Sequence, residues 1–352
     1  MRASPGAPRT PHVDPTPHQT TSRRRRLPGL LAAGLVTALA LALPSSASAL
    51  PGASGTPRAT AGLEQVSDFG DNPGALSMYR YVPEGLPQGS PVVVILHGCA
   101  QSAADYFDGA GWQSLADEHG FAVVAPQQEI LNNASRCFNW FEPGDRSRGQ
   151  GEAASIQHMV DHTLSDLGAD SSRVHVTGLS GGGAMTASLL ASYPDTYAGG
   201  GIVAGLPHGC ADSMVTAFTC MNPGVTKSAK EWGDLVRAAH PDHQGARPVV
   251  SLWHGSADAT VAPGNLTESV KQWTDVQGAD QEADGTEQLP GETTREDYQD
   301  ADGKVVVRSY QVAGMGHGTP VKPDEGCGTS GTYFPDRVCS SSLLLKDWGL
   351  AG

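Results

Sequence analysis

Basic side chains are scarce in this sequence. Lys and Arg together number 23 against 37 Asp and Glu, which gives a formal net charge of −14 at pH 7. Six of the Arg residues and one Asp fall within residues 1–49, so the remainder holds 17 basic and 36 acidic residues. A strongly negative protein repels nucleic acid and anionic membrane surfaces. We therefore expect neither as a partner, and a neutral substrate is favoured.

Signals for cofactors and metals are also missing. The sequence has no phosphate-binding loop, and no Gly-x-Gly-x-x-Gly motif opens the first helix. Its cysteines show neither the two-residue spacing nor the accompanying histidines of a zinc site. We expect no cofactor and no metal.

The first 49 residues have the pattern of an export signal. Arg23–Arg26 form a basic stretch, Leu27–Leu43 an apolar run, and Ala47-Ser48-Ala49 a small-residue cleavage site. The apolar run falls short of the roughly 20 residues of a membrane span, although a retained anchor is the alternative interpretation. We interpret residues 1–49 as a signal peptide of a secreted, extracellular protein. The general secretory and twin-arginine routes both fit.

All six cysteines follow this leader, and an even count in an exported chain favours disulfides. Pairing Cys210 with Cys220 and Cys327 with Cys339 closes two short loops. Cys99 and Cys137 then remain for the third bond.

Residues 50–72 are rich in Gly, Pro, Ala and Thr, and we expect a loose segment there. Residues 73–352 contain no repeat or linker and are interpreted as one catalytic domain. Apolar runs typical of buried strands alternate with segments of helical spacing. The expected strands are 92–96, 121–125, 174–177, 202–204, 249–253 and 305–312, and the expected helices 112–119, 152–167 and 182–192. This alternation predicts an α/β fold with a mostly parallel sheet and helices on both faces.

The strongest local motif is Gly178-Leu179-Ser180-Gly181-Gly182, a Gly-x-Ser-x-Gly pentapeptide between an expected strand and an expected helix. In the α/β-hydrolase fold this context forms a sharp turn that exposes a nucleophilic serine. The helix that follows offers free N–H groups to a developing oxyanion. Ser180 is therefore the candidate nucleophile. The alternative is a glycine-rich turn with an incidental serine.

A serine nucleophile needs a base and an acid that orients the base. In this fold both follow the serine, the acid first and the histidine last, on loops after strands. Asp258 and His317 satisfy that order. We interpret His97, His208 and His254 as structural histidines, and His240 and His243 as part of a solvated loop.

The oxyanion hole requires a second donor beside the Gly181 amide. Leu96-His97-Gly98-Cys99 follows an early strand, and the Cys99 amide is our candidate. A bond from Cys99 to Cys137 would hold this loop in place; alternatively, it only closes a loop.

These residues resemble the polyhydroxybutyrate depolymerase family of esterases, which also holds feruloyl and acetylxylan esterases. The resemblance rests on residues 96–101, 137–141, 178–182, 204–210 and 254–258. It implies Ser180, Asp258 and His317 as a catalytic triad, with the Cys99 and Gly181 amides as oxyanion donors. It also implies that 137–141 contributes to the acyl pocket. Asn139, Trp140 and Trp253 are the candidate pocket residues, with core packing as the alternative for either tryptophan.

We therefore expect a secreted serine carboxylic-ester hydrolase, a depolymerase-type esterase acting on short-chain polyhydroxyalkanoate. The alternatives are a feruloyl or acetylxylan esterase and, more remotely, a non-catalytic binding module. Depolymerases that attack solid polymer usually carry a further binding domain, whereas about 35 residues follow His317 here. This departure weakens the expectation of adsorption to a crystalline surface. The sequence does not indicate an oligomeric state.

Overall fold

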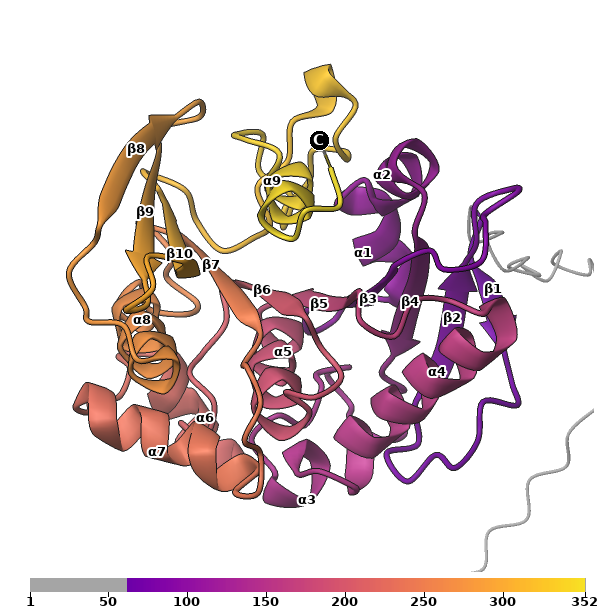
Figure 1. Ribbon diagram of the computed structural model, residues 1–352, viewed down its shortest axis with the longest axis horizontal. Coiled ribbons are helices and arrows are strands. Elements are labelled where there is room, and N and C mark those ends of the chain that lie inside the picture. Colours follow the sequence, from indigo (N-terminus) through magenta and orange to yellow (C-terminus); the bar gives the residue numbers. More distant parts are fainter. Residues whose placement is uncertain (1–61, 352) are drawn as a thin grey trace, which may run out of the picture. The chain divides into compact units, whose positions relative to one another are not determined.

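A ten-stranded mixed sheet runs through residues 62–351, the part of the chain that this computed structural model describes (Figure 1). The expected signal peptide, 1–49, lies outside the described residues, as does most of the segment 50–72. The strand order is β1-β2-β4-β3-β5-β6-β7-β10-β9-β8. The bounds are β1 Glu64–Val66, β2 Ser77–Tyr81, β3 Val92–Leu96, β4 Ala122–Gln127, β5 Val174–Leu179, β6 Gly199–Val203, β7 Val249–Gly255, β8 Gly285–Leu289, β9 Thr293–Gln299 and β10 Val305–Val312.

The middle of the sheet is parallel and its two margins are antiparallel. Strands β4, β3, β5, β6, β7 and β10 pair in parallel. Strands β1 and β2 extend one side antiparallel, and β9 and β8 extend the other. Because the six parallel strands share a direction, the loops at their carboxyl ends meet along one edge, where ligands bind in open α/β sheets.

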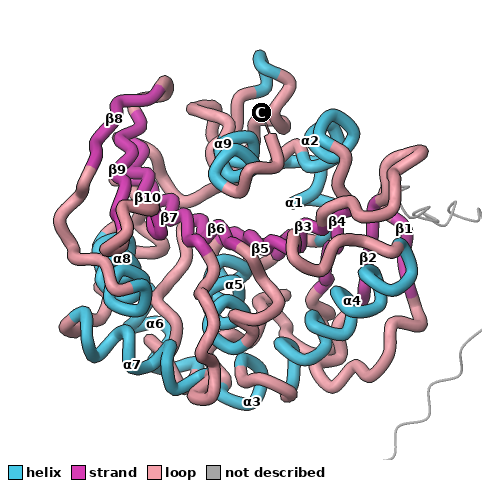
Figure 2. The backbone as a smooth tube through the Cα atoms, viewed as in Figure 1, coloured by secondary structure: helices cyan, strands magenta, loops and turns pink. Residues whose placement is uncertain are grey.

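Helices cover both faces of the sheet (Figure 2). One face carries α1 Ala103–Gly109, α2 Trp112–His119 and α9 Ser340–Asp347. The other carries α3 Pro143–Arg146, α4 Gly151–Leu167, α5 Gly181–Ser192, α6 Met214–Met221, α7 Ala229–Ala239 and α8 Gly264–Gln277. A short 3₁₀ helix spans Pro323–Glu325.

Strand β3 shows why the sheet is buried on both sides. All five residues of Val92–Leu96 are buried. Val92, Val94 and Leu96 pack into the core beneath α4, α5 and α8, whereas the alternate residues Val93 and Ile95 pack beneath α1, α2 and α9. Successive side chains of a strand point to opposite faces, so a continuous apolar run supplies both cores.

The fold class agrees with the prediction, since the sheet is mostly parallel and flanked by helices on both faces. Each expected strand and helix is present, with ends that differ by a few residues. Strand β1 lies inside the 50–72 segment that we expected to be loose, and it pairs with β2. The sequence prediction did not include β2, β8, β9, α1, α3, α6, α7, α8 or α9.

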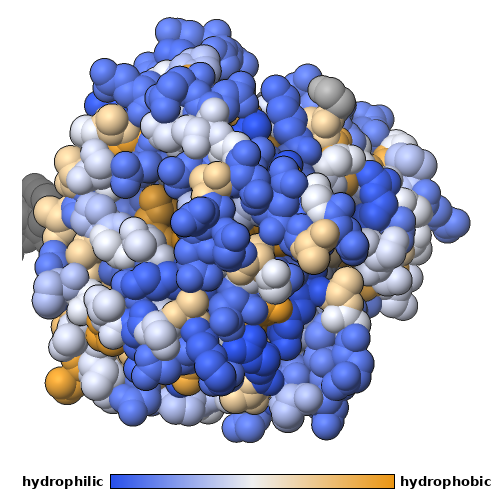
Figure 3. Space-filling model, turned by 60° about the vertical axis from the view of Figure 1, so that its left-hand side comes forward, coloured by the Kyte–Doolittle hydropathy of each residue, from blue (hydrophilic) through white to orange (hydrophobic). Residues whose placement is uncertain are grey.

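The structure forms three disulfides, Cys99–Cys137, Cys210–Cys220 and Cys327–Cys339. The last two are the pairs that the spacing favoured, and the first is the pair that remained. Among residues 62–351, no helix is both long and apolar enough to cross a membrane. On the face that Figure 3 shows, hydrophilic residues predominate and apolar ones are scattered among them.

Candidate active site

Ser180 occupies a sharp turn between strand β5 and helix α5. Its backbone angles are φ 58° and ψ −117°, a conformation that residues with a Cβ rarely adopt. Its amide donates to the Val203 carbonyl of the neighbouring strand at 2.9 Å, and its own carbonyl accepts from Ala184 at 2.8 Å. These bonds hold the turn in a strained geometry of the kind that clusters at functional sites.

The glycines of the pentapeptide are required by close backbone packing. A Cβ added at Gly178 would lie 2.5 Å from the carbonyl oxygen of Gly182, and one added at Gly182 would collide with the carbonyl oxygen of Leu96. Helix α5 can therefore start directly behind β5 and against the end of β3 only if both positions lack a side chain.

Asp258 and His317 come from adjacent loops. Strands β7 and β10 pair in parallel, and Asp258 follows the first while His317 follows the second. The His317 Nδ1 lies 2.7 Å from Asp258 Oδ2. His317 and Ser180 both line a small cavity of about 120 Å³, together with Gly98, Gln101, Thr260 and Tyr333. The structure thus brings the three predicted residues to the same edge of the sheet.

The Asp258 carboxyl is buried but well supplied with hydrogen bonds. Its Oδ1 accepts from the amides of Thr260 at 2.8 Å and Val261 at 2.9 Å, and its Oδ2 pairs with His317. Burial acts to raise the pKa of Asp258, but the hydrogen bonds and the attraction of His317 outweigh it, so the pKa lies below its ordinary value. Asp258 is therefore ionised at neutral pH and accepts the Nδ1 proton of His317.

A second histidine flanks this carboxylate. His254 is 2 % exposed, and its Nε2 lies 2.9 Å from the Val261 carbonyl oxygen and 3.5 Å from Asp258 Oδ2. Burial lowers the pKa of His254, so the ring is neutral and its Nε2 proton points toward Val261. The structural interpretation of His254 fits this setting, although sequence reasoning did not foresee its proximity to Asp258.

The other two structural candidates are also buried. His97 Nε2 accepts from the Gln128 amide at 3.0 Å, and burial lowers its pKa to about 4. His208 Nδ1 lies 3.1 Å from Ser188 Oγ, and burial lowers the pKa of His208 to about 3. Both rings are neutral packing groups.

The residues that carry the two candidate oxyanion donors, Cys99 and Gly181, are neighbours and line one cavity. A Cβ added at Gly181 would be 3.1 Å from Cys99 Sγ. Within residues 62–351, neither the Cys99 amide nor the Gly181 amide donates to another protein group. The Cys99–Cys137 disulfide and a bond from the Ala100 amide to the Ser135 carbonyl, 2.8 Å, fix the Cys99 loop.

Ser180 also lines a larger and mostly apolar cavity of about 270 Å³. Trp140 lines it, as the resemblance implied. Helix α6 and loops near it supply a further part of the wall, through Leu206, Met214, Ala217, Phe218, Met221 and Val261. Sequence reasoning did not propose any of them as pocket residues: Leu206 lies in the 204–210 segment that carries the resemblance, and no motif marks the other five.

Two of the three tentative pocket residues lie elsewhere. Trp253 is 1 % exposed and stacks on Tyr310, with ring centroids 3.9 Å apart, in the core beneath α9. The alternation of side chains along β7 directs it there, so it lines neither cavity. Asn139 does not line the cavity; its Oδ1 accepts from the lining residue Asn133 at 2.8 Å.

A buried carboxyl supports this wall from behind. Glu152 Oε2 accepts from the Asn139 amide at 2.7 Å, and its Oε1 accepts from the side chains of Gln128, 2.5 Å, and Asn132, 3.2 Å. Burial, followed by repulsion from Asp145, raises the pKa of Glu152 to about 8. In the sequence Glu152 resembles an ordinary acidic residue in the first turn of a helix, so nothing signalled this network.

Comparisons with known proteins show the family of the chain. Residues 76–300 match the family model described as Esterase PHB depolymerase. Poly(3-hydroxyalkanoate) depolymerase C of Paucimonas lemoignei is 50 % identical over 82 % of this chain and 70 % of its own length. Feruloyl esterase B of Thermothelomyces thermophilus is 37 % identical over 75 % of this chain and 91 % of its own.

A solved structure extends the similarity to three dimensions. The acetyl xylan esterase from Aspergillus awamori superimposes with a TM-score of 0.70 at 29 % identity, covering 82 % of this chain and 99 % of that one. The family match spans well over half of the chain, and the relatives share one chemistry. The chain therefore belongs to the Esterase PHB depolymerase family and is a carboxylic-ester hydrolase.

Proposed function

We propose that Ser180 is the nucleophile of an acyl-enzyme mechanism, with His317 as general base and Asp258 as the group that orients it. The observation that carries this proposal is the 2.7 Å contact between His317 Nδ1 and Asp258 Oδ2 on loops that share a cavity with Ser180. With Nδ1 donating to the carboxylate, Nε2 is unprotonated and free to accept the Ser180 proton.

In the first half-reaction, Ser180 Oγ bonds to the ester carbonyl carbon as its proton passes to His317 Nε2. The carbonyl oxygen becomes an oxyanion, which the free amides of Cys99 and Gly181 stabilise. Collapse breaks the bond to the alcohol oxygen, which takes the proton from His317. Water then attacks the acyl-enzyme, gives a proton to His317, and releases the carboxylic acid as Ser180 regains its proton.

The two cavities divide the substrate between them. His317 must reach the leaving alcohol oxygen, so the alcohol part lies on the side of the smaller cavity that His317 lines. The acyl part then extends into the apolar cavity beside Trp140. An acetyl group would leave most of that cavity empty, whereas a chain of apolar hydroxyacid units fills both sides of the scissile bond.

We therefore propose a short-chain polyhydroxyalkanoate, polyhydroxybutyrate above all, as the substrate class. The similarity to the Paucimonas lemoignei depolymerase supports it. Feruloylated and acetylated plant polysaccharides are the competing substrates. The feruloyl esterase relative, which is 37 % identical to this chain, supports this alternative.

Product analysis distinguishes these substrates. The purified enzyme is incubated in parallel with amorphous polyhydroxybutyrate, feruloylated arabinoxylan and acetylated xylan, and released acids are quantified. We expect hydroxybutyrate monomers and oligomers at rates well above ferulate or acetate release. Faster release of ferulate or acetate would assign the enzyme to plant cell-wall esters instead.

The catalytic role of Ser180 is tested by Ser180→Ala. The substitution removes one buried oxygen, so the protein should remain folded, while turnover of a soluble p-nitrophenyl butyrate substrate should fall about a millionfold. The circular dichroism melting curve serves as the folding control. Turnover within a hundredfold of wild type would reject the assignment.

We also propose that the protein is exported. The leader pattern of residues 1–49 supports this, as do three disulfides, which persist in oxidising compartments. Expression with and without residues 1–49, followed by assay of the medium, tests it: the shortened chain should stay in the cell.

A further inference from the structure

Helix α6 exposes an apolar face. Its eight residues, Met214–Met221, include no charged side chain, and only Ala217 and Cys220 are buried. Met214 is 53 % exposed, Phe218 66 % and Val215 78 %. A contiguous apolar surface of this kind marks an interaction site more often than it is incidental.

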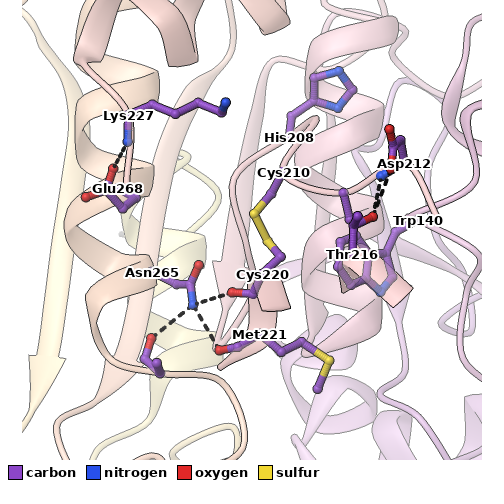
Figure 4. The surroundings of a disulfide bond; sticks show 12 residues. Trp140, His208, Cys210, Asp212, Thr216, Cys220, Met221, Lys227, Asn265 and Glu268 are labelled. Carbon is purple, nitrogen blue, oxygen red and sulfur yellow. Dashed lines mark hydrogen bonds between the residues drawn. A yellow bond between two sulfur atoms is a disulfide. The ribbon is translucent and has the colours of Figure 1, made fainter. Parts of the chain in front are cut away.

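The helix is held firmly in this orientation. The Cys210–Cys220 disulfide ties it to the preceding loop, and Ser213 caps its N-terminus by accepting from the Thr216 amide. From α8, Asn265 donates to the carbonyl oxygens of Cys220, 3.2 Å, and Met221, 3.3 Å (Figure 4). The fold therefore fixes α6 in an orientation that exposes its apolar face to solvent.

This face continues into the catalytic cavity. Met214 and Phe218 line the 270 Å³ cavity together with Ser180. A chain that enters the cavity along α6 must pass over these two exposed side chains.

A second exposed apolar segment borders the same cavity. Asn133 and Ser135 line the cavity, and the residues just before them, Ile130 and Leu131, are 56 % and 99 % exposed. Asn132 anchors this segment through its bond to Glu152.

The distribution of exposed apolar residues is uneven over the described chain. Seven large apolar side chains are exposed within residues 62–351. Five belong to the two segments just described, and Tyr333 lines the smaller cavity beside His317. Only Val82, at the end of β2, lies outside the cavity-lining segments.

We propose that Ile130, Leu131, Met214, Val215 and Phe218 form an adsorption surface by which the enzyme docks on solid aliphatic polyester. This inference rests on the proposed function and adds the physical form of the substrate. An uncharged polymer surface suits these five uncharged, apolar side chains on a protein of net charge −14, because their own burial at the polymer requires no desolvation of ions. The polymer then lies at the cavity mouth, and a chain end or loop needs to move only a short way to reach Ser180.

The test uses Leu131→Ser/Val215→Ser, because neither residue lines a cavity. Val82→Ser is the matched control, an exposed apolar residue away from the cavities. Binding to amorphous polyhydroxybutyrate particles is measured by depletion in the Ser180→Ala background, so that the polymer stays intact. Hydrolysis of soluble p-nitrophenyl butyrate is measured with Ser180 present.

We expect the double variant to lose about tenfold in particle affinity, since two apolar side chains no longer become buried at the polymer. Its soluble-ester kcat/KM should stay within twofold of wild type, and Val82→Ser should change neither value. Unchanged particle binding in the double variant would overturn the proposal.

Two further outcomes distinguish polymer adsorption from a dimer interface and from a failure of the proposed function. A wild-type dimer in sedimentation that the double variant converts to monomer would assign the face to a second copy of the chain and overturn adsorption. Failure of the wild type to hydrolyse the soluble ester would refute the proposed function itself, whatever the particles show.

Discussion

Asp258 links local electrostatics to the pH range of the site. Its carboxyl accepts three hydrogen bonds while it is buried, and its pKa lies below the ordinary value. A depressed folded-state pKa stabilises the protein above the unfolded-state pKa, and that contribution is lost as pH falls through the folded-state value. Asp258 therefore stays ionised in mild acid and continues to accept the Nδ1 proton of His317 there.

Asp258→Asn tests the orienting role. An amide in that position donates as readily as it accepts, so it no longer fixes the Nδ1–H tautomer of His317. We expect kcat for p-nitrophenyl butyrate to fall about 10⁴-fold with the fold preserved. The Ser180→Ala protein gives the floor of the assay. A loss of less than tenfold would show that His317 takes its orientation from elsewhere, for instance through His254.

Glu152 provides a pH signature in stability. Its folded-state pKa of about 8 lies above the ordinary value of 4.5. The stabilising contribution is then fully present below pH 4.5 and is lost as pH rises toward 8. In Glu152→Gln, denaturant unfolding should lose this slope, which is at most about 1.4 kcal/mol per pH unit.

The exposed Glu118 supplies the matched control, since Glu118→Gln should leave the pH dependence as in wild type. If Glu152→Gln keeps the wild-type slope between pH 5 and 8, another group is responsible. A loss of kcat in the same variant would add that the Asn139 bond positions the cavity wall.

Chain order marks some residues of the candidate site, whereas the roles of others depend on tertiary contacts. Ser180, Asp258 and His317 follow strand ends in a fixed order, so chain order alone marks them. Glu152 acts through partners at positions 128, 132 and 139, and Trp253 turns away from the site by strand alternation. Such relations depend on tertiary packing, which no short motif records.

At the level of elements, two of the three disulfides have different roles. Cys99–Cys137 joins the candidate oxyanion loop to the cavity wall, whereas Cys327–Cys339 closes a loop at the start of α9, away from both cavities. Both should stabilise the fold by about 2–5 kcal/mol. Only the first should matter for the position of the Cys99 amide.

Paired substitutions separate these roles. We expect Cys99→Ala/Cys137→Ala to lower kcat by about ten- to a hundredfold with little change in KM, because a looser loop aims its amide less well at the oxyanion. Cys327→Ala/Cys339→Ala should lower the melting temperature without that loss. Equal kcat in the two double variants would mean that the first disulfide only closes a loop.

The sequence predicted the strands whose two faces are both buried. Strands such as β3 are apolar throughout and stand out in the sequence. Strands β8 and β9 are polar, and β8 is largely exposed while most of β9 is only half-buried, so their sequences resemble loops. Helix α6 was missed for the opposite reason, since an uncharged helix of eight residues has too little polar contrast to show a period.

At the scale of the whole molecule, the negative net charge coexists with a local concentration of exposed apolar side chains. The chain is acidic, yet six of the seven large apolar side chains that are exposed within residues 62–351 belong to segments that line the two cavities at Ser180. This arrangement keeps the protein soluble and leaves the mouth of the site suited to a neutral, apolar ester. The fold places the three candidate residues at one sheet edge, which is why distant loops can act on one bond.

The central claim is that this edge makes Ser180 an activated nucleophile. Labelling with an alkyl fluorophosphonate, followed by digestion and mass spectrometry, tests it most directly, because only an activated serine displaces the fluoride. We predict one adduct per chain, on Ser180, with loss of esterase activity in proportion to labelling. No adduct on Ser180, or full activity in a fully labelled protein, would contradict the account.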